Sequence, residues 1–317
     1  SLLLLIVSII PLVRCFSPLP KGHLYPQIGT NGYVAGAGVS HTMNSRSLPL
    51  RTFCKFSSQN EHDTSAENQP RESNAFPSLS ILGVCGSIGS GKSFACSLLT
   101  SKINGLDAIS TSAYHIDTDS LAHGVYAPGS KAIDDIANEF GEDVIADGAV
   151  DRKALGAIVF NDQDKMATLE RIVWPHVKSL LLRKIEEIQQ SQKEDGDNEE
   201  THGLVIVEAA VLLDANWDEH ELFDGIWIVR ASPETSAQRL VEKRGMDRED
   251  ALKRMEAQLS RRGIGNWEEE LEGGTVTAVI ENEGSDLWER MKECLKDPDC
   301  WKIKRCPPLS NVYLDVI

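Results

Sequence analysis

An octapeptide of the form G-x-x-x-x-G-K-S, at residues 86–93, constrains the fold of this chain more than any other segment does. It consists of Gly86, Ser87, Ile88, Gly89, Ser90, Gly91, Lys92 and Ser93. Its glycines allow the backbone to turn inward, so that successive N–H groups point at a single anion. An apolar run at Ser80–Cys85 predicts a buried strand before it, and Phe94–Lys102 predicts a helix after it. Strand, glycine-rich loop and helix in this order predict a phosphate-binding loop for a nucleotide.

The last residues of the octapeptide have the chemistry that a bound nucleotide requires. Lys92 is expected to reach the outer phosphates, and the Ser93 hydroxyl is the expected Mg²⁺ ligand. Phe94 is expected to complete the nucleotide-binding segment. A GTPase switch would also need an Asn/Thr-Lys-x-Asp sequence late in the chain, and the chain contains none. The motif therefore predicts nucleotide binding, and the reaction has to be inferred from an acceptor site.

Strands and helices are predicted to alternate through the folded part of the chain. Further strands are expected at residues 113–116, 204–207, 226–229 and 276–280, and helices at residues 133–140, 152–160, 165–190, 233–244, 248–259 and 287–295. This order predicts an α/β fold with a parallel sheet covered by helices on both faces. The long helix is expected to be interrupted at Pro175. The polar, acidic stretch 189–203 is expected to form a solvated loop.

Two carboxylates, Asp117 and Asp119, follow the second predicted strand directly. Because the carboxyl ends of parallel strands lie along one edge of a sheet, these side chains are expected beside the phosphate-binding loop. One of them can accept the proton of an attacking hydroxyl, while the other can hold the base or a water bound to Mg²⁺. The alternative is structural, with Asp119 or Ser120 capping a helix. The complete phosphate-binding loop favours the catalytic interpretation.

Basic residues are concentrated late in a domain that is otherwise acidic. They lie on and after the two helices predicted at residues 233–244 and 248–259, and they are Arg239, Lys243, Arg244, Arg248, Arg254, Arg261 and Arg262. In a phosphotransferase such a segment can close over the phosphates as a lid. For any single arginine, the alternative is a solvated helix face with ion pairs such as Glu249 with Lys253.

The first sixty residues contain five basic side chains and no acidic one, whereas the whole chain has a net charge of −16. That net charge argues against nucleic-acid binding through phosphate contacts. The apolar run Leu2–Val13 is too short to span a bilayer and has the length of a signal-peptide core. We expect residues 1–77 to be a targeting presequence and disordered linker, residues 78–297 the folded domain, and residues 298–317 a peripheral tail.

The order of apolar core, Phe16 and basic, Ser-rich stretch resembles the two-part presequences of algae whose plastids lie inside the secretory membrane system. This resemblance predicts a plastid location and no stable membrane span in the mature domain. The alternatives are a membrane anchor in the secretory system, which would suit a tethered scaffold, and mitochondrial import.

Seven cysteines are too sparse for a disulfide scaffold. Cys85 and Cys96 flank the phosphate-binding loop and are expected to be buried as small apolar side chains, with a reactive thiol as the alternative. Cys294, Cys300 and Cys306 are evenly spaced but form no C-x-x-C pair and have no interleaved histidine, so their spacing predicts no metal site.

Residues 80–295 resemble the dephospho-CoA kinase family, whose motifs occur here in the family's order. Besides the phosphate-binding loop they are Ile116-Asp117-Thr118-Asp119, Ala127-Pro128-Gly129-Ser130, Asp147-Gly148, Asp151-Arg152-Lys153 with Leu155 and Val159-Phe160, Trp174-Pro175, Ala209–Asp214, Pro233-Glu234-Thr235, Arg239, Gln258, and Val279-Ile280 with Asn282 and Gly284. The Trp-Pro and Ala-Ala-Val-Leu-Leu forms resemble the kinase half of the animal bifunctional CoA synthase most.

The resemblance implies transfer of the γ-phosphate of ATP, with Mg²⁺, to the ribose 3′-hydroxyl of dephospho-CoA in the last step of coenzyme A synthesis. It also implies a P-loop NTPase sandwich of three layers, similar to nucleoside monophosphate kinases, with helical substrate and lid segments. The residue roles that it implies are Asp119 as general base, assisted by Asp117 and Lys92, Arg239, Lys243 and Arg261 in the lid over ATP, Asn282 beside the adenine, and His123 and Arg152 on the side of dephospho-CoA.

Four positions depart from the family pattern or use its rarer form, namely His123, Asp214, Lys243 beside Arg244, and Thr277. None of them removes the phosphate-binding loop or Asp119, so an active enzyme is expected. Two other functions stay open. One is a P-loop kinase for another small molecule, such as a nucleoside monophosphate or a sugar-like hydroxyl. The other is a non-catalytic protein that binds ATP. The oligomeric state is not predicted.

Overall fold

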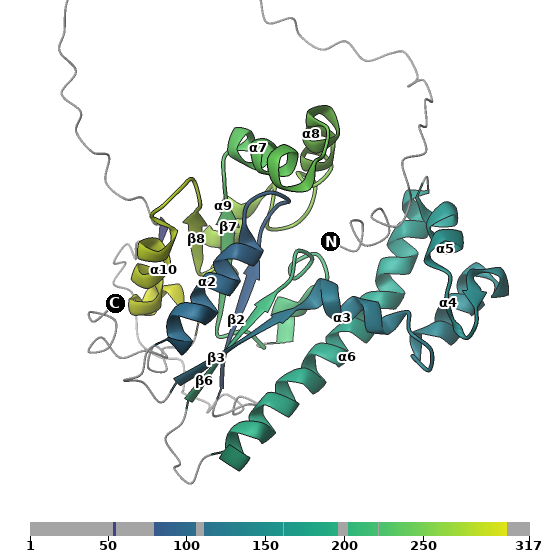
Figure 1. Ribbon diagram of the computed structural model, residues 1–317, viewed down its shortest axis with the longest axis horizontal. Coiled ribbons are helices and arrows are strands. Elements are labelled where there is room, and N and C mark those ends of the chain that lie inside the picture. The colour runs from purple at the N-terminus through teal and green to yellow at the C-terminus, as the bar shows by residue number, and fades with distance from the viewer. Residues whose placement is uncertain are drawn as a thin grey trace, which may run out of the picture.

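The computed structural model describes residues 53–54, 79–105, 111–160, 162–195, 202–220 and 222–302. Its centre is a six-stranded sheet in the order β1-β8-β7-β2-β6-β3 (Figure 1). The strands are β1 (Phe53–Cys54), β2 (Leu79–Cys85), β3 (Thr111–Asp117), β6 (His202–Glu208), β7 (Gly225–Arg230) and β8 (Ala278–Glu281). All of them run parallel except β1, which pairs antiparallel with β8. The predicted α/β fold with a parallel sheet is confirmed.

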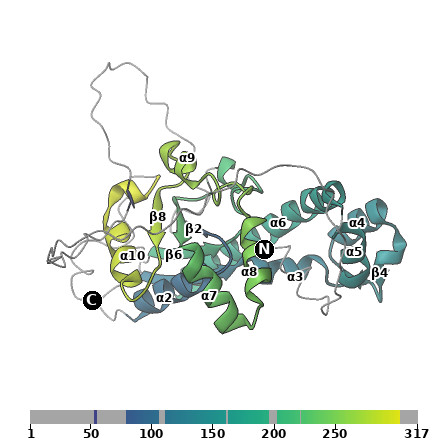
Figure 2. The ribbon, with the colours of Figure 1, turned by 90° about the horizontal axis from the view of Figure 1, so that it is seen from above.

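Helices cover both faces of this sheet. They are α2 (Lys92–Asn104), α3 (Thr118–Val125), α4 (Ala132–Phe140), α5 (Arg152–Val159), α6 (Gln163–Asp195), α7 (Pro233–Arg244), α8 (Arg248–Glu256), α9 (Trp267–Glu272) and α10 (Leu287–Lys296). The buried side chains of α2 and α10 form an apolar cluster on one face, and those of α6 form another on the opposite face. Seen from above, α4 and α5 lie at the end of the molecule far from α10, with α7 and α8 between them (Figure 2).

Apart from β1, the predicted presequence at residues 1–77 lies outside the described residues. Residues 303–317 of the predicted tail also lie outside them, whereas its first residues form a 3-10 turn at Pro298–Cys300. Across the described part of the chain, no helix combines the length and the hydrophobicity that crossing a membrane would require.

The strand register brings three strand ends level along one edge of the sheet. Since β2 lies between β6 and β7, Val84 pairs with both Glu208 and Trp227. Asp117, the last residue of β3, also pairs with Glu208, the last residue of β6. The carboxyl ends of β2, β3 and β6 are therefore neighbours, and the phosphate-binding loop starts from this edge at Gly86.

The prediction that the long helix is interrupted at Pro175 is wrong. The helix α6 is 33 residues long and continues through this proline. An internal proline destabilises a helix by about 3 kcal/mol. The helix nevertheless buries a stripe with a spacing of four residues on both sides of the proline, at Leu169, Val173, Val177, Leu181 and Ile185. Each such side chain contributes about 1.5–3 kcal/mol on burial. Together they outweigh the lost backbone hydrogen bond.

Two local features differ from the sequence expectation. The loop expected at residues 189–203 is shorter, because α6 continues to Asp195 and β6 begins at His202. Glu, Lys and Gln are good helix formers, which explains the extension. A hairpin of β4 (Ile145–Ala146) and β5 (Ala149–Val150) was not predicted, although Asp147-Gly148 is a typical hairpin turn. Both turn residues have positive φ angles, 52° and 74°.

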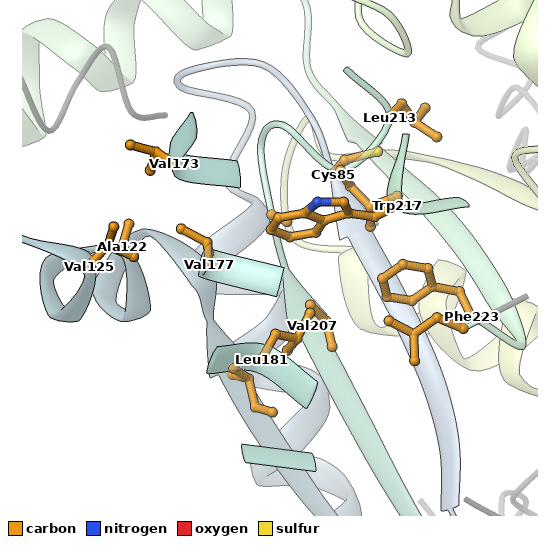
Figure 3. Packing of buried hydrophobic residues seen from close by; sticks show 14 of the residues in the cluster. Cys85, Ala122, Val125, Val173, Val177, Leu181, Val207, Leu213, Trp217 and Phe223 are labelled. Carbon is orange, nitrogen blue, oxygen red and sulfur yellow. The ribbon is translucent and has the colours of Figure 1, made fainter. Parts of the chain in front are cut away.

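The larger apolar cluster joins the sheet to α6 and α3. Figure 3 shows Leu181 of α6 beside Val207 of β6, with the indole ring of Trp217 above them, and Val177 of α6 on the side of Ala122 and Val125 of α3. Trp217 is only 2% exposed. Because α3 packs on the same helix through this cluster, the helix that carries Asp119 is fixed relative to the sheet.

The cysteines that flank the phosphate-binding loop are buried free thiols, as predicted. Burial raises the pKa of Cys85 to about 12, so this thiol is protonated at neutral pH. Cys294 and Cys300 are also buried. They lie with Cys96 in the cluster between α2, α10 and the sheet.

Candidate active site

The phosphate-binding loop leaves β2 at Gly86 and ends where α2 begins at Lys92, so its predicted context is confirmed. Gly89 has a φ angle of +79°, and a Cβ atom on it would lie 2.7 Å from the Ser236 carbonyl oxygen. Gly91 has a φ angle of +87°, and its Cβ atom would lie 2.3 Å from Asn282 Nδ2. Glycine is therefore required at both positions by backbone conformation and by space.

Two of the residues predicted to bind ATP support this loop from the other end of the domain. Asn282, just after β8, donates its Nδ2 to the Ser90 carbonyl oxygen at 2.8 Å. Arg239 of α7 donates to the same oxygen at 3.2 Å and to the Asn282 carbonyl oxygen at 2.9 Å. Lys243, one turn further along α7, is exposed. The structure thus brings Arg239 and Asn282 together at the loop.

The segment after α8 also contacts the loop. The Ile88 N–H donates to the Gln258 side-chain oxygen at 2.8 Å, and Gln258 is only 9% exposed. Ile88 packs with Leu240 of α7 and Ala251 of α8 in a separate small apolar cluster. The predicted lid helices are therefore anchored on the phosphate-binding loop itself.

Glu208, which directly follows the strand expected at residues 204–207, was not predicted from the sequence to belong to this site. Its Oε1 atom accepts a hydrogen bond from Ser93 Oγ at 2.5 Å and lies 3.6 Å from Lys92 Nζ. Its Oε2 atom is 3.1 Å from His115 Nε2. Burial raises the pKa of Glu208, but the contacts with His115, Lys92 and Ser93 outweigh it and lower that pKa overall. The site therefore contains a buried carboxylate that is ionised at neutral pH.

Asp117 and Asp119 lie on the edge where they were predicted, and the cap of α3 is Asp117 instead of Asp119 or Ser120, the two residues of the structural alternative. Asp117 caps α3, because its carboxylate accepts hydrogen bonds from the Asp119 N–H at 2.9 Å and from Ser120 Oγ at 2.7 Å. Its backbone is extended, as a cap requires, whereas Asp119 already lies in the first helical turn. Asp119 is partly exposed at the end of the strand next to β6.

The two residues predicted on the side of dephospho-CoA contact each other. Arg152, the first residue of α5, places its NH1 atom 2.9 Å from Nδ1 of His123 on α3. The imidazole is exposed and the guanidinium is partly exposed. Since α3 also carries Asp119, the three side chains belong to neighbouring elements on one side of the sheet edge.

Arg261 was predicted to lie in the lid over ATP, but in this structure its guanidinium forms ion pairs within the protein and does not face the phosphate-binding loop. Its guanidinium donates to Glu170 of α6 at 3.0 Å and to Asp214 at 3.2 Å, with 19% of the side chain exposed. Burial lowers its pKa, but the two carboxylates raise it above its ordinary value. Arg261 thus ties the end of the lid segment to α6 and to the loop after β6.

Arg262 forms a second set of ion pairs beside it. Its guanidinium donates to Glu270 at 2.6 Å, to Asp218 at 2.9 Å and to the Leu213 carbonyl oxygen at 3.1 Å. Glu270 and Asp218 are almost entirely buried, with side chains 10% and 9% exposed. Arg262 therefore joins α9 to the segment that follows β6.

We expect Arg262→Met to lower the free energy of unfolding by about 2–4 kcal/mol, because it leaves two buried carboxylates without their cation. This expected loss is smaller than that for a fully buried ion pair because the Arg262 side chain is 30% exposed. Urea unfolding at pH 7 measures the change. Lys253→Met is the control, since its pair with Glu249 is exposed on α8, and it should leave the midpoint almost unchanged. Equal effects of the two changes would contradict the prediction.

Comparison with known proteins places the chain among relatives of one family. The family model described as CoaE, Dephospho-CoA kinase, matches residues 80–285. A dephospho-CoA kinase of Symbiobacterium thermophilum is 33% identical over 183 residues, which are 57% of this chain and 68% of that protein. A dephospho-CoA kinase of Geobacter sulfurreducens is 31% identical over 218 residues, which are 68% of this chain and 96% of that protein.

Among solved structures, TT1252 from Thermus thermophilus is 28% identical and covers 68% of this chain and 96% of its own, with a TM-score of 0.49. The family model and the relatives carry the assignment, because they extend over more than half of the chain and over most of each relative. The chain therefore belongs to the dephospho-CoA kinase family.

Proposed function

We propose that this protein transfers the γ-phosphoryl group of ATP to the ribose 3′-hydroxyl of dephospho-CoA. The observation that carries the proposal is the position of Asp119 in the first turn of α3, on the sheet edge where β2 leads into the phosphate-binding loop. In-line transfer from a nucleotide to a hydroxyl needs a phosphate cradle for the nucleotide and a base beside the attacking hydroxyl, opposite the leaving group. Membership of the family supports ATP as donor and dephospho-CoA as acceptor.

On the donor side, the loop N–H groups and the N-terminal end of α2 offer partial positive charge to the phosphates. Lys92 adds a full charge and is held near this position by Glu208 until a nucleotide binds. Arg239 and Asn282 keep the loop in shape through Ser90. We assign Asn282 to a position beside the adenine of ATP, and exposed Lys243 to a position beside its phosphates.

On the acceptor side, Asp119 is assigned as general base. Its carboxylate takes the proton of the 3′-hydroxyl while the oxygen bonds to the γ-phosphorus and ADP leaves on the opposite side. Asp117 is a positioning residue, because its carboxylate caps the turn that carries Asp119. His123 and Arg152 provide hydrogen-bond donors and positive charge for the phosphates of dephospho-CoA.

The side chains beside Lys92 fit a Mg²⁺ ion. The Ser93 hydroxyl and the Glu208 carboxylate are oxygen donors whose atoms lie 2.5 Å apart, and Glu208 is ionised. Hard divalent cations take oxygen ligands of this kind and keep several waters. When bound, Mg²⁺ neutralises charge on the β- and γ-phosphate oxygens. Ser93 and Glu208 would hold it, directly or through water.

Phosphoryl transfer by the full chain tests the proposal. With Mg²⁺ and ATP, we expect ADP release with dephospho-CoA at a kcat/KM at least about 10²-fold above that with AMP, adenosine or a sugar. The product should carry a new phosphate on the 3′-oxygen, which phosphorus NMR identifies. Preferred turnover of AMP or a sugar would instead indicate another small-molecule kinase. ATP binding without release of ADP for any acceptor would indicate a non-catalytic protein.

A further inference from the structure

A second group of metal-binding side chains lies next to the proposed site, and the proposed reaction does not use two of its three members. Cys96 of α2, His115 of β3 and Glu208 of β6 each offer one ligand atom, and the three atoms lie within 4.8 Å of one another. The closest pair is His115 Nε2 and Glu208 Oε2, at 3.1 Å. No spacing in the sequence marks this group, because its members come from three separate elements.

The sheet and α2 hold these residues on one face. Side chains of a strand alternate between faces, so His115 shares its face with Ala113, and Glu208 shares its face with Ile206. Ala113 and Ile206 pack in the same buried cluster as Cys96. The three ligand atoms therefore meet between regular elements of the fold.

We propose that Cys96, His115 and Glu208 bind a transition-metal ion of the Zn²⁺ type. Zinc binds thiolate sulfur at about 2.3 Å, and imidazole nitrogen and carboxylate oxygen at about 2.0–2.2 Å. In tetrahedral geometry these lengths separate neighbouring ligand atoms by about 3.3–3.8 Å, so the cluster needs side-chain shifts of about 1 Å. A fourth position remains for water, as in zinc sites with three protein ligands.

The sulfur ligand distinguishes this ion from Mg²⁺. Thiolates select zinc and similar metals, whereas Mg²⁺ takes oxygen ligands. The Cys96 thiol releases its proton to solvent as the metal–sulfur bond forms. The His115 side chain is 22% exposed, and Cys96 is only 1% exposed, so the ion reaches the cluster from the imidazole side.

Zinc at this cluster would compete for Glu208. The same carboxylate accepts the hydrogen bond from Ser93 and neutralises Lys92 in the free protein. A metal bound through Cys96 and His115 withdraws Glu208 from both partners. Zinc is therefore expected to inhibit phosphoryl transfer, a consequence that rests on the proposed function, whereas binding itself does not.

Titration of the full chain with Co²⁺, under a reductant without thiols, tests the binding directly. We expect one equivalent of Co²⁺ to give thiolate-to-metal charge-transfer absorption, which Zn²⁺ then displaces and Mg²⁺ does not. Cys96→Ala should abolish this absorption, and His115→Gln should weaken Co²⁺ binding at least about 10-fold. Cys294→Ala is the matched control, because Cys294 is buried in the same apolar cluster and lies outside the metal cluster.

Absence of the absorption in the natural chain, or its survival in Cys96→Ala, would overturn the proposal. If Cys96→Ala does not fold, Cys96→Ser and His115→Gln give the same test, the latter at a side chain that is 22% exposed. At a buffered concentration of free Zn²⁺, turnover of the natural chain should fall while that of Cys96→Ala persists, which excludes chelation of ATP as the cause. If no acceptor is phosphorylated at all, the proposed function fails, and the Co²⁺ titration still decides whether the metal binds.

Discussion

Asp119→Asn is expected to lower kcat by about 10²-fold or more, because the amide cannot take the proton of the attacking hydroxyl. The amide keeps the size of the carboxylate, and Asp119 lies apart from the contacts that hold the phosphate-binding loop. The dissociation constant of ATP should therefore change little. Steady-state turnover with saturating dephospho-CoA and calorimetric titration with ATP measure the two quantities separately.

The matched control for this change is Asp134→Asn. Asp134 also lies in the first turn of a helix, α4, and is exposed. Both substitutions remove a charge that interacts favourably with a helix N-terminus, so the control subtracts that contribution. A kcat of Asp119→Asn within twofold of the control would exclude Asp119 as base. A larger loss in Asp117→Asn, which preserves a good cap, would transfer the role to Asp117.

Glu208→Gln is expected to lower kcat/KM for ATP by about 10²-fold or more and to raise the Mg²⁺ concentration needed for half-maximal rate. Glutamine keeps the shape and one side-chain oxygen but removes the negative charge beside Lys92 and Ser93. Mg²⁺ titrations of the rate at fixed ATP give both quantities. An unchanged Mg²⁺ dependence would show that Glu208 plays no part in holding the ion.

Glu281→Gln is the control for Glu208→Gln. Glu281 ends β8 as Glu208 ends β6, but it pairs with Arg230 at 3.1 Å and lies away from Lys92. We expect less than a tenfold effect from it. Since the pKa of Glu208 is lowered, the contribution of its charge is complete above the ordinary carboxyl range and is lost only as the pH falls through that lowered value.

The donor half of the site could be predicted because its residues are contiguous. Residues 86–93 follow one another, and their order fixes strand, loop and helix without knowledge of the sheet. The position of Asp119 could also be predicted, because it needs only the rule that parallel strands end at one edge. Asp117 was assigned to catalysis. Its capping contacts could not be predicted, because they depend on the backbone angles of this single residue.

Glu208 could not be found in the same way. It comes 115 residues after Ser93, and the contact between them exists only because β6 is inserted beside β2 in the sheet. The order of the strands along the chain does not predict that β6 pairs with β2. Arg261 illustrates a related difficulty. Its charge suggested a phosphate contact, but its partners Glu170 and Asp214 lie far away in the sequence and become visible only in the fold.

The unbroken course of α6 has a mechanical consequence. At about 1.5 Å per residue the 33-residue helix is about 50 Å long. Its middle and later turns, at Leu181 and Ile185, are buried in the cluster with the sheet, while α4 and α5 pack along its earlier part, as Figure 1 shows. Its later turns are thus fixed on the sheet, and its earlier turns support α4 and α5. The position of Arg152 relative to the phosphate-binding loop is consequently set by two supports, the long helix on which α5 packs and the contact of Arg152 with His123 of α3.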